Sequence, residues 1–82
     1  MTLKVISAEA VLFEGEVTSV TLPGEMGAFT VLRNHASLIS TLVPGQIAYR
    51  GKDVADSAEP AIIEVSGGIA VVDDNVVSVC VI

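Results

Sequence analysis

Few residues in this sequence of 82 have side chains suited to nucleophilic, acid–base or metal chemistry. His35 is the only histidine and Cys80 the only cysteine, and a long stretch of chain separates them. A nucleophile–base pair also needs a third group that orients the base, and the sequence offers none beside either residue. We interpret Cys80 as a packed or partly covered strand residue. His35 either satisfies its own loop or lies in a contact patch with Met26, Phe29 and Ser37.

The acidic and glycine-rich segments also lack the spacing of known chemical motifs. Glu14 and Glu16 share one face of an expected strand, which indicates a solvated face. Asp73-Asp74-Asn75 lacks the alternating ligands and distal glutamate of a calcium loop, so it predicts a turn. Pro23-Gly24-Glu25-Met26-Gly27 is not followed by the Lys-Ser/Thr pair of a phosphate-binding loop. We therefore expect no metal, no cofactor and no active site.

The composition narrows the class of protein. Hydrophobic residues make up 51% of the chain but aromatic residues only 4%, so the core must be built from Val, Ile and Leu, which suit pleated sheets. The net charge of −6 argues against nucleic acid or anionic lipid as a direct partner, since both require clustered Lys and Arg. No apolar run reaches the ~20 residues of a membrane helix, and no signal peptide is evident. We expect one cytosolic domain over residues 1–82, without membrane insertion and, with a single cysteine, without an internal disulfide.

The elements that must position these residues are predicted to be short strands. Apolar residues alternate with a period of two in most segments, and no window keeps a helical period over three turns. Turns are expected at Pro23-Gly24, Pro44-Gly45 and Asp73 to Asn75, and a two-residue hairpin turn at Gly67-Gly68. This pattern is typical of an antiparallel β-sandwich or a small barrel with eight to ten strands.

Four local features are expected within that pattern. Gly15 should interrupt the strand that starts at Val11, and a β-bulge near Thr18-Ser19 should restore the inward phase of the following residues. The segment Arg33 to Ser37 should be a loop with at most one helical turn. The polar stretch from Gly51 to Pro60 should be a loop at a hairpin tip.

Several stretches, in order and nearly without gaps, match the pattern of one protein family. They are Val5-Ile6-Ser7-Ala8-Glu9, Phe13-Glu14-Gly15, the run from Val17 to Gly27, His35-Ala36-Ser37-Leu38-Ile39, Pro44-Gly45 and Val65-Ser66-Gly67-Gly68-Ile69. No single stretch is very specific, but all of them in sequence are. Over its whole length the chain resembles the N-terminal domain of the ε subunit of F-type ATP synthase.

This resemblance implies an all-β fold, a flattened antiparallel β-sandwich of eight to ten short strands. It also implies a non-catalytic central-stalk subunit of the rotor that binds the γ subunit and the c-ring and helps couple proton translocation to ATP synthesis. By position, Ser7, His35 and Ser40 fall at the γ interface. The loop residues that fall at the c-ring interface are Met26, Gly27, Ala28 and Phe29. The implied location is peripheral, in the F1 sector on the cytoplasmic face of the bacterial inner membrane.

The sequence departs from the family pattern in two respects. The family usually has an acidic residue at the position of Ala28, and Leu-Gly and Pro-Gly pairs before the histidine. With Ala28 in that place, we expect Phe29 and Arg33 to offer the c-ring a more apolar contact with one basic neighbour. Most members also continue into a C-terminal helical hairpin; we expect that domain to be absent here, and with it inhibition of ATP hydrolysis and binding of ATP.

An alternative from the residues alone is a small-ligand-binding β-sandwich, such as a carbohydrate or lipid module. Such a module needs a concave pocket lined by aromatic side chains. The chain offers only Phe13, Phe29 and Tyr49 for stacking. We therefore expect protein partners, which the resemblance implies are γ and the c-ring, and no self-association.

Overall fold

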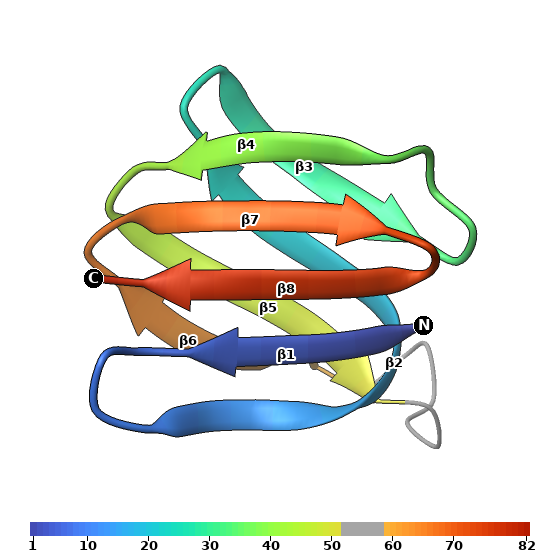
Figure 1. The fold of residues 1–82 in the computed structure, drawn as a ribbon, viewed down its shortest axis with the longest axis horizontal. Helices are drawn as coiled ribbons and strands as arrows, with labels where there is room; N and C mark the ends of the chain where they lie inside the picture. The colour runs from blue at the N-terminus through green and yellow to red at the C-terminus, as the bar shows by residue number, and fades with distance from the viewer. Residues whose placement is uncertain (52–58) are drawn as a thin grey trace.

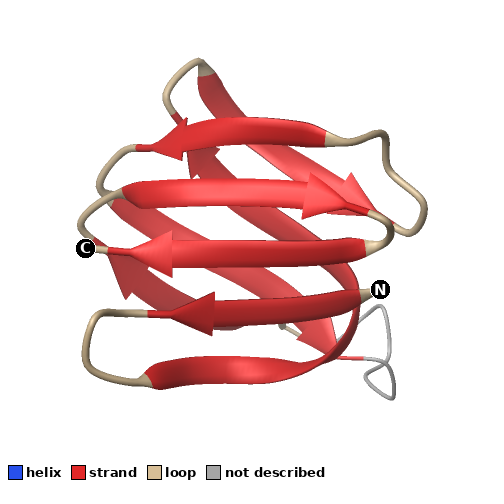
Figure 2. Ribbon diagram, viewed as in Figure 1, coloured by secondary structure: helices blue, strands red, loops and turns tan. Residues whose placement is uncertain are grey.

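The computed structural model describes residues 1–51 and 59–82, and all regular structure in these ranges is strand (Figure 2). Within them, no helix could cross a membrane. The eight strands are β1 (Thr2–Ile6), β2 (Val11–Gly24), β3 (Gly27–Leu32), β4 (Leu38–Leu42), β5 (Gly45–Gly51), β6 (Ala61–Val65), β7 (Gly68–Asp73) and β8 (Val76–Val81).

The strands form two layers that face each other, as expected for a β-sandwich (Figure 1). We call the layer of β4, β7, β8, β1 and the first part of β2 the front sheet. The back sheet contains β3, the second part of β2, β5 and β6. The pairs are antiparallel except β1 with β8, which is parallel, so the first and last strands of the chain are neighbours in the front sheet.

Strand β2 belongs to both layers, and the expected interruption at Gly15 is wrong. The strand runs without a break for 14 residues, pairing first with β1 and then with β3 and β5. The expected β-bulge is confirmed, because the register against β5 shifts between Val17 and Ser19. The extra residue there lets Val17 and Val20 both point inward, and both are buried.

The core lies between the two sheets and contains no buried polar or charged residue within the described ranges. Aliphatic side chains fill it, as the low aromatic content predicts. The alternation is confirmed in β1 and β8, where Leu3, Val5 and Val79 are almost completely buried. Phe13 of the front sheet and Tyr49 of the back sheet stack between the layers with ring centroids 4.3 Å apart.

The turns agree with the sequence in part. Asp74 and Asn75 form the turn between β7 and β8 with positive φ angles of 49° and 62°, which confirms that prediction. The turn expected at Pro23-Gly24 is wrong, because both residues pair with β3 and the reversal lies at Glu25 and Met26. An extended backbone is possible here because Gly24 has no side chain, and a Cβ on it would lie 2.7 Å from the Phe29 ring.

The hairpin turn expected at Gly67-Gly68 is also wrong. Strand β6 pairs with β5, whereas β7 pairs with β4 and β8, so these two glycines carry the chain from the back sheet to the front sheet. Both have positive φ, and a Cβ on Gly68 would lie 2.2 Å from the carbonyl oxygen of Cys80. Glycine is needed at Gly68 because the β8 backbone passes directly beside it.

The two expected loops have different outcomes. The segment from Arg33 to Ser37 is a loop, as predicted, but it contains no helical turn. It contains instead a single reversal at Asn34, whose φ is 61°. Most of the loop predicted from Gly51 to Pro60 lies outside the described residues, although Gly51 itself is the last residue of β5.

Candidate functional site

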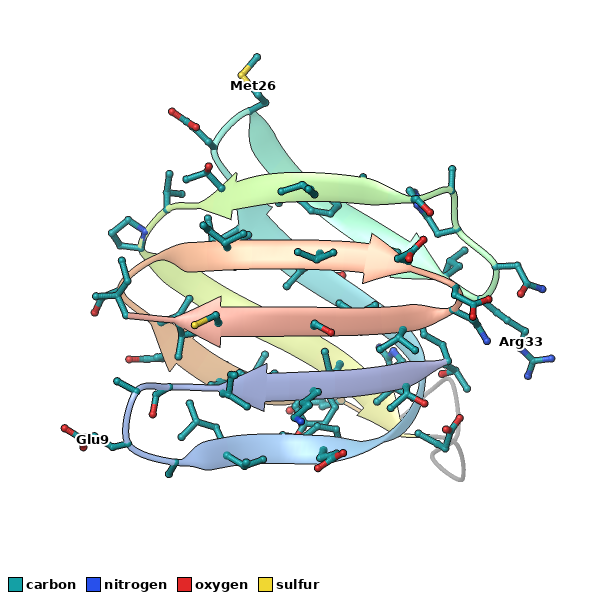
Figure 3. All side chains as sticks on the ribbon, viewed as in Figure 1. Glu9, Met26 and Arg33 are labelled. Carbon is teal, nitrogen blue, oxygen red and sulfur yellow. The ribbon has the colours of Figure 1, made fainter. Side chains whose placement is uncertain are left out.

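The loops that carry the predicted contact residues lie at separate corners of the sandwich. In Figure 3, Glu9 marks the β1–β2 loop, Met26 the β2–β3 hairpin and Arg33 the β3–β4 loop. The structure therefore does not group His35 with Met26 and Phe29, and the single contact patch considered for them is wrong. Strand β3 separates Met26 from the loop of His35.

The β2–β3 hairpin presents Met26 to solvent. Its side chain is 100% exposed, and Gly27 and Ala28 are exposed beside it. Phe29 differs, because it is half-buried and packs against the core. Two backbone bonds of 2.9 Å, from the Glu25 amide to the Thr41 carbonyl and from the Val43 amide to the Pro23 carbonyl, fix the base of the hairpin to β4 and the β4–β5 connection. The tip is thus a flexible apolar side chain on an anchored base.

Ser7 is half-buried and orders the β1–β2 loop. Its hydroxyl oxygen accepts from the amides of Glu9 and Ala10 at 3.3 and 3.2 Å. Its own amide donates to the Ala10 carbonyl at 2.8 Å. These bonds close a compact turn beside the front sheet, so Ser7 shapes the β1–β2 loop.

His35 is exposed at the other end of the front sheet, whereas Ser40 points toward the core. The Nδ1 atom of His35 lies 2.8 Å from the Ala36 carbonyl oxygen, which can only accept, so Nδ1 carries the proton in this contact. In the neutral ring, Nε2 is then the acceptor atom. Ser40 is half-buried opposite Ala70, which is fully buried, and its hydroxyl donates to the Thr41 carbonyl at 3.2 Å.

An apolar stripe crosses the outer surface of the front sheet between the Ser7 and His35 loops. Its members are Ile6, Ile39, Ile69, Val71 and Cys80. Cross-strand pairing makes it continuous, since Ile6 is opposite Cys80, Cys80 opposite Ile69, and Val71 opposite Ile39. Ile39 is 76% exposed and Ile69 51%. Shallow depressions in this surface are lined by Lys4, Ser78 and members of the stripe.

The stripe was not predicted, although the sequence contains a signal for it. The run Ile69-Ala70-Val71-Val72 is apolar at every position, which is typical of a strand covered on both faces. In the structure only Ala70 and Val72 face the core. Packing of the core therefore does not explain why Ile69 and Val71 are apolar. An uncovered apolar sheet surface of this kind marks an interaction site.

The geometry offers no catalytic or metal centre within the described residues. No group of three His, Cys, Asp or Glu side chains converges there. Cys80 lies five positions along β8 from Asn75, which contacts the His35 loop, so about 16 Å of extended strand separates Cys80 from that loop. Asp73 is also engaged, because its Oδ1 accepts from the Ser37 hydroxyl at 2.7 Å.

The whole chain, residues 1–82, matches the family model described as the ATP synthase delta/epsilon chain, beta-sandwich domain. The ATP synthase epsilon chain of Leptospira borgpetersenii is 39% identical over 79 residues, covering 96% of this chain and 58% of that protein. The ATP synthase epsilon chain of Campylobacter jejuni is 37% identical over 82 residues, covering 100% and 59%. The chain therefore spans less than two thirds of the length of these curated relatives.

Two solved structures share the fold. A chain of the Tetrahymena thermophila mitochondrial ATP synthase central stalk and c-ring superposes with a TM-score of 0.80 at 16% identity, covering 100% of this chain and 63% of that one. A chain of the Euglena gracilis mitochondrial ATP synthase, from a structure of OSCP, F1 and c-ring, gives 0.82 at 23% identity, covering 96% and 48%. With the family match over its full length, this chain belongs to the β-sandwich domain family of ATP synthase delta and epsilon chains.

Proposed function

We propose that this chain is a non-catalytic rotor subunit of an F-type ATP synthase, which binds the γ subunit and the c-ring and helps couple proton translocation to ATP synthesis. In this role it lies peripherally at the cytoplasmic face of a bacterial inner membrane. It supplies no reacting group, and its task is to connect two partners rigidly. A sandwich with an aliphatic core suits this task because close-packed interiors transmit force with little deformation.

The observation that carries the proposal is the apolar stripe between the loops of Ser7 and His35. These loops lie at opposite ends of the front sheet, so one partner that contacts both must lie across the sheet and cover the stripe. Covering Ile39, Ile69 and Val71 removes apolar surface from water, which is the main favourable term in most protein association. We assign this surface to γ. Ser40, beneath it, contributes by supporting β4.

The c-ring contact is assigned to the β2–β3 hairpin. Met26 extends fully into solvent there, and its unbranched side chain adapts to a partner surface. Gly27 and Ala28 leave room beside it, while Phe29 holds the hairpin against the core. The assignment places the two partners at different corners of one rigid body, as a coupling subunit requires.

The alternative of a small-ligand module has little support from this geometry. Phe13 and Tyr49 are stacked against each other between the sheets, and Phe29 packs on the core. The depressions on the front sheet are lined instead by aliphatic, small polar and charged residues, none of which is aromatic. A sugar would find no aromatic platform there.

A crossed binding experiment tests the proposal. The purified chain is titrated with its cognate γ subunit and, separately, with detergent-solubilised c-ring. Ile39→Asp should weaken γ binding and leave c-ring binding unchanged, because it places a charge in the stripe. Met26→Asp should do the opposite. Both variants should keep the circular dichroism spectrum of the parent, since both side chains are exposed.

Two results would count against the proposal. Failure of the parent chain to bind either partner would remove the rotor role. If each variant weakened binding to both partners equally, the rotor role would stand, but γ and the c-ring would not bind separate surfaces.

A further inference from the structure

We infer that Asn75 and Asp73, in and beside the β7–β8 turn, are positioning residues that hold the β3–β4 loop so that His35 faces the partner in one conformation. This inference rests on the proposed function, in which His35 belongs to the γ contact. It adds a role to a turn that makes no assigned contact with either partner. For the neutral imidazole, the partner group it predicts opposite His35 is a hydrogen-bond donor.

Two hydrogen bonds connect the turn to the loop, one on each side of His35. The Asn34 amide donates to Oδ1 of Asn75 at 2.9 Å. The Ser37 hydroxyl donates to Oδ1 of Asp73 at 2.7 Å. The residue before His35 and the residue two places after it are therefore both fixed to the same turn.

The loop has little else to order it. All five residues from Arg33 to Ser37 are exposed, so no buried side chain anchors them. The loop's own backbone hydrogen bond, from the His35 amide to the Leu32 carbonyl, is 3.2 Å long and local. An exposed loop without packing loses conformational freedom when a partner binds, and this loss weakens the affinity. Bonds that order the loop beforehand reduce that loss.

The turn itself is well placed to act as an anchor. It is the tight connection between two central strands of the front sheet, with Asp73 opposite Val76 in the ladder. The Asn75 carbonyl also accepts from the Thr2 amide at 3.1 Å, which joins the turn to β1. Asn75 thus links the loop to the sheet that carries the apolar stripe.

The orientation of the imidazole gives the chemistry of the expected partner. Nδ1 donates to the Ala36 carbonyl, so in the neutral imidazole Nε2 is left as an acceptor at the exposed end of the ring. A hydroxyl, an amide N–H or an ammonium group on the partner could donate a hydrogen bond to Nε2. The direction of Nε2 depends on the loop conformation, which is why the turn matters for recognition.

The test compares two substitutions of Asn75 that differ in one property. Asn75→Gly accepts the φ of 62° and removes the side-chain oxygen, whereas Asn75→Asp keeps an oxygen acceptor at the same place. Each variant of the full chain is examined for amide hydrogen exchange of Asn34 by NMR and for its affinity for the cognate γ subunit.

We expect Asn75→Gly to speed exchange of the Asn34 amide and to weaken γ binding about fivefold, the value of one hydrogen bond. Asn75→Asp should keep both the exchange rate of the Asn34 amide and the affinity for γ at the values of the parent chain. In a His35→Ala background, Asn75→Gly should weaken binding no further, because the loop then has no imidazole to position.

Several results would overturn the inference while leaving the proposed function in place. They are an unchanged affinity in Asn75→Gly when His35→Ala weakens binding, an Asn75→Asp variant as weak as Asn75→Gly, and additive effects in the double variant. Failure of the parent chain to bind γ would instead overturn the proposed function. The exchange rate of the Asn34 amide would then decide alone whether the turn orders the loop.

Discussion

The two outer faces of the sandwich are built from the same kind of strand but differ in chemistry. On the front sheet, Ile39, Ile69 and Val71 expose apolar surface in adjacent strands. On the back sheet, Thr21 is opposite Thr30 on one side and Ala48 on the other, and the two hydroxyl oxygens lie 2.9 Å apart. A face that stays in water needs no apolar stripe. This difference is the reason why we assign the proposed γ contact to the front face.

The exposed apolar residues of the back sheet support the same conclusion by their positions. Leu32 and Ile62 are 57% and 48% exposed, but they lie on β3 and β6, the two edge strands, with β2 and β5 between them. Apolar side chains scattered singly are normal on any protein surface. A continuous stripe over four adjacent strands is not, so arrangement rather than number distinguishes the two faces.

The largest effect is expected at the connection that joins the two sheets. Gly68→Ala should cost more than about 3 kcal/mol of unfolding free energy, because its Cβ would overlap the Cys80 carbonyl and no flexible side chain can move aside. Gly27→Ala is the matched control: its φ is also positive, at 122°, but nothing lies within 4 Å of the added Cβ. It should cost only the backbone strain, about 1–3 kcal/mol. Urea denaturation measures both; equal losses would show that backbone strain, not the close contact, dominates at Gly68.

The next effect compares the faces directly. Ile69 and Ile62 are the same residue type with nearly equal exposure, 51% and 48%, on opposite faces. Ile69→Asp should reduce the affinity for γ by more than about 30-fold, because a charge would lie in the centre of the covered stripe. Ile62→Asp should leave the affinity unchanged. Calorimetric titration provides the comparison, and a greater loss in Ile62→Asp would assign γ to the back face.

The smallest effect concerns the back face alone. Thr21→Val and Thr30→Val each remove one partner of the same exposed hydroxyl pair. A double-mutant cycle should give a coupling of about 0.5 kcal/mol in unfolding free energy. Neither variant should alter γ binding. A change in γ affinity here would mean that the polar face also takes part in assembly.

The sequence predicted local features of the fold well because side-chain alternation records them. The inward faces of β1 and β8 and the bulge between Val17 and Ser19 were all visible as phase in the apolar pattern. The turn predictions at Pro23-Gly24 and Gly67-Gly68 failed for a different reason. Glycine marks a place where a side chain does not fit, and close approach of Phe29 or of the β8 backbone requires it as much as a turn does.

The candidate site was predicted less completely than the fold. The exposed Met26 and the loop of His35 could be found because each lies in a short stretch with turn residues. The inward orientation of Ser40 could not be predicted from the sequence, because it depends on the pairing of β4 with β7. The apolar stripe escaped notice since its members come from β1, β4, β7 and β8, and no single segment of sequence contains it.

Residue types and their alternation were enough to predict that the chain forms short strands and that their aliphatic faces close on a core. These properties depend on residue type and on a period of two, which are local. Strand pairing in the folded chain established that β2 belongs to both sheets and that β1 lies parallel to β8. It also brings together the members of the apolar stripe, Ile6, Cys80, Ile69, Val71 and Ile39. The physical reason is that strands pair through backbone groups common to all residues, so a strand's own pattern does not name its neighbours.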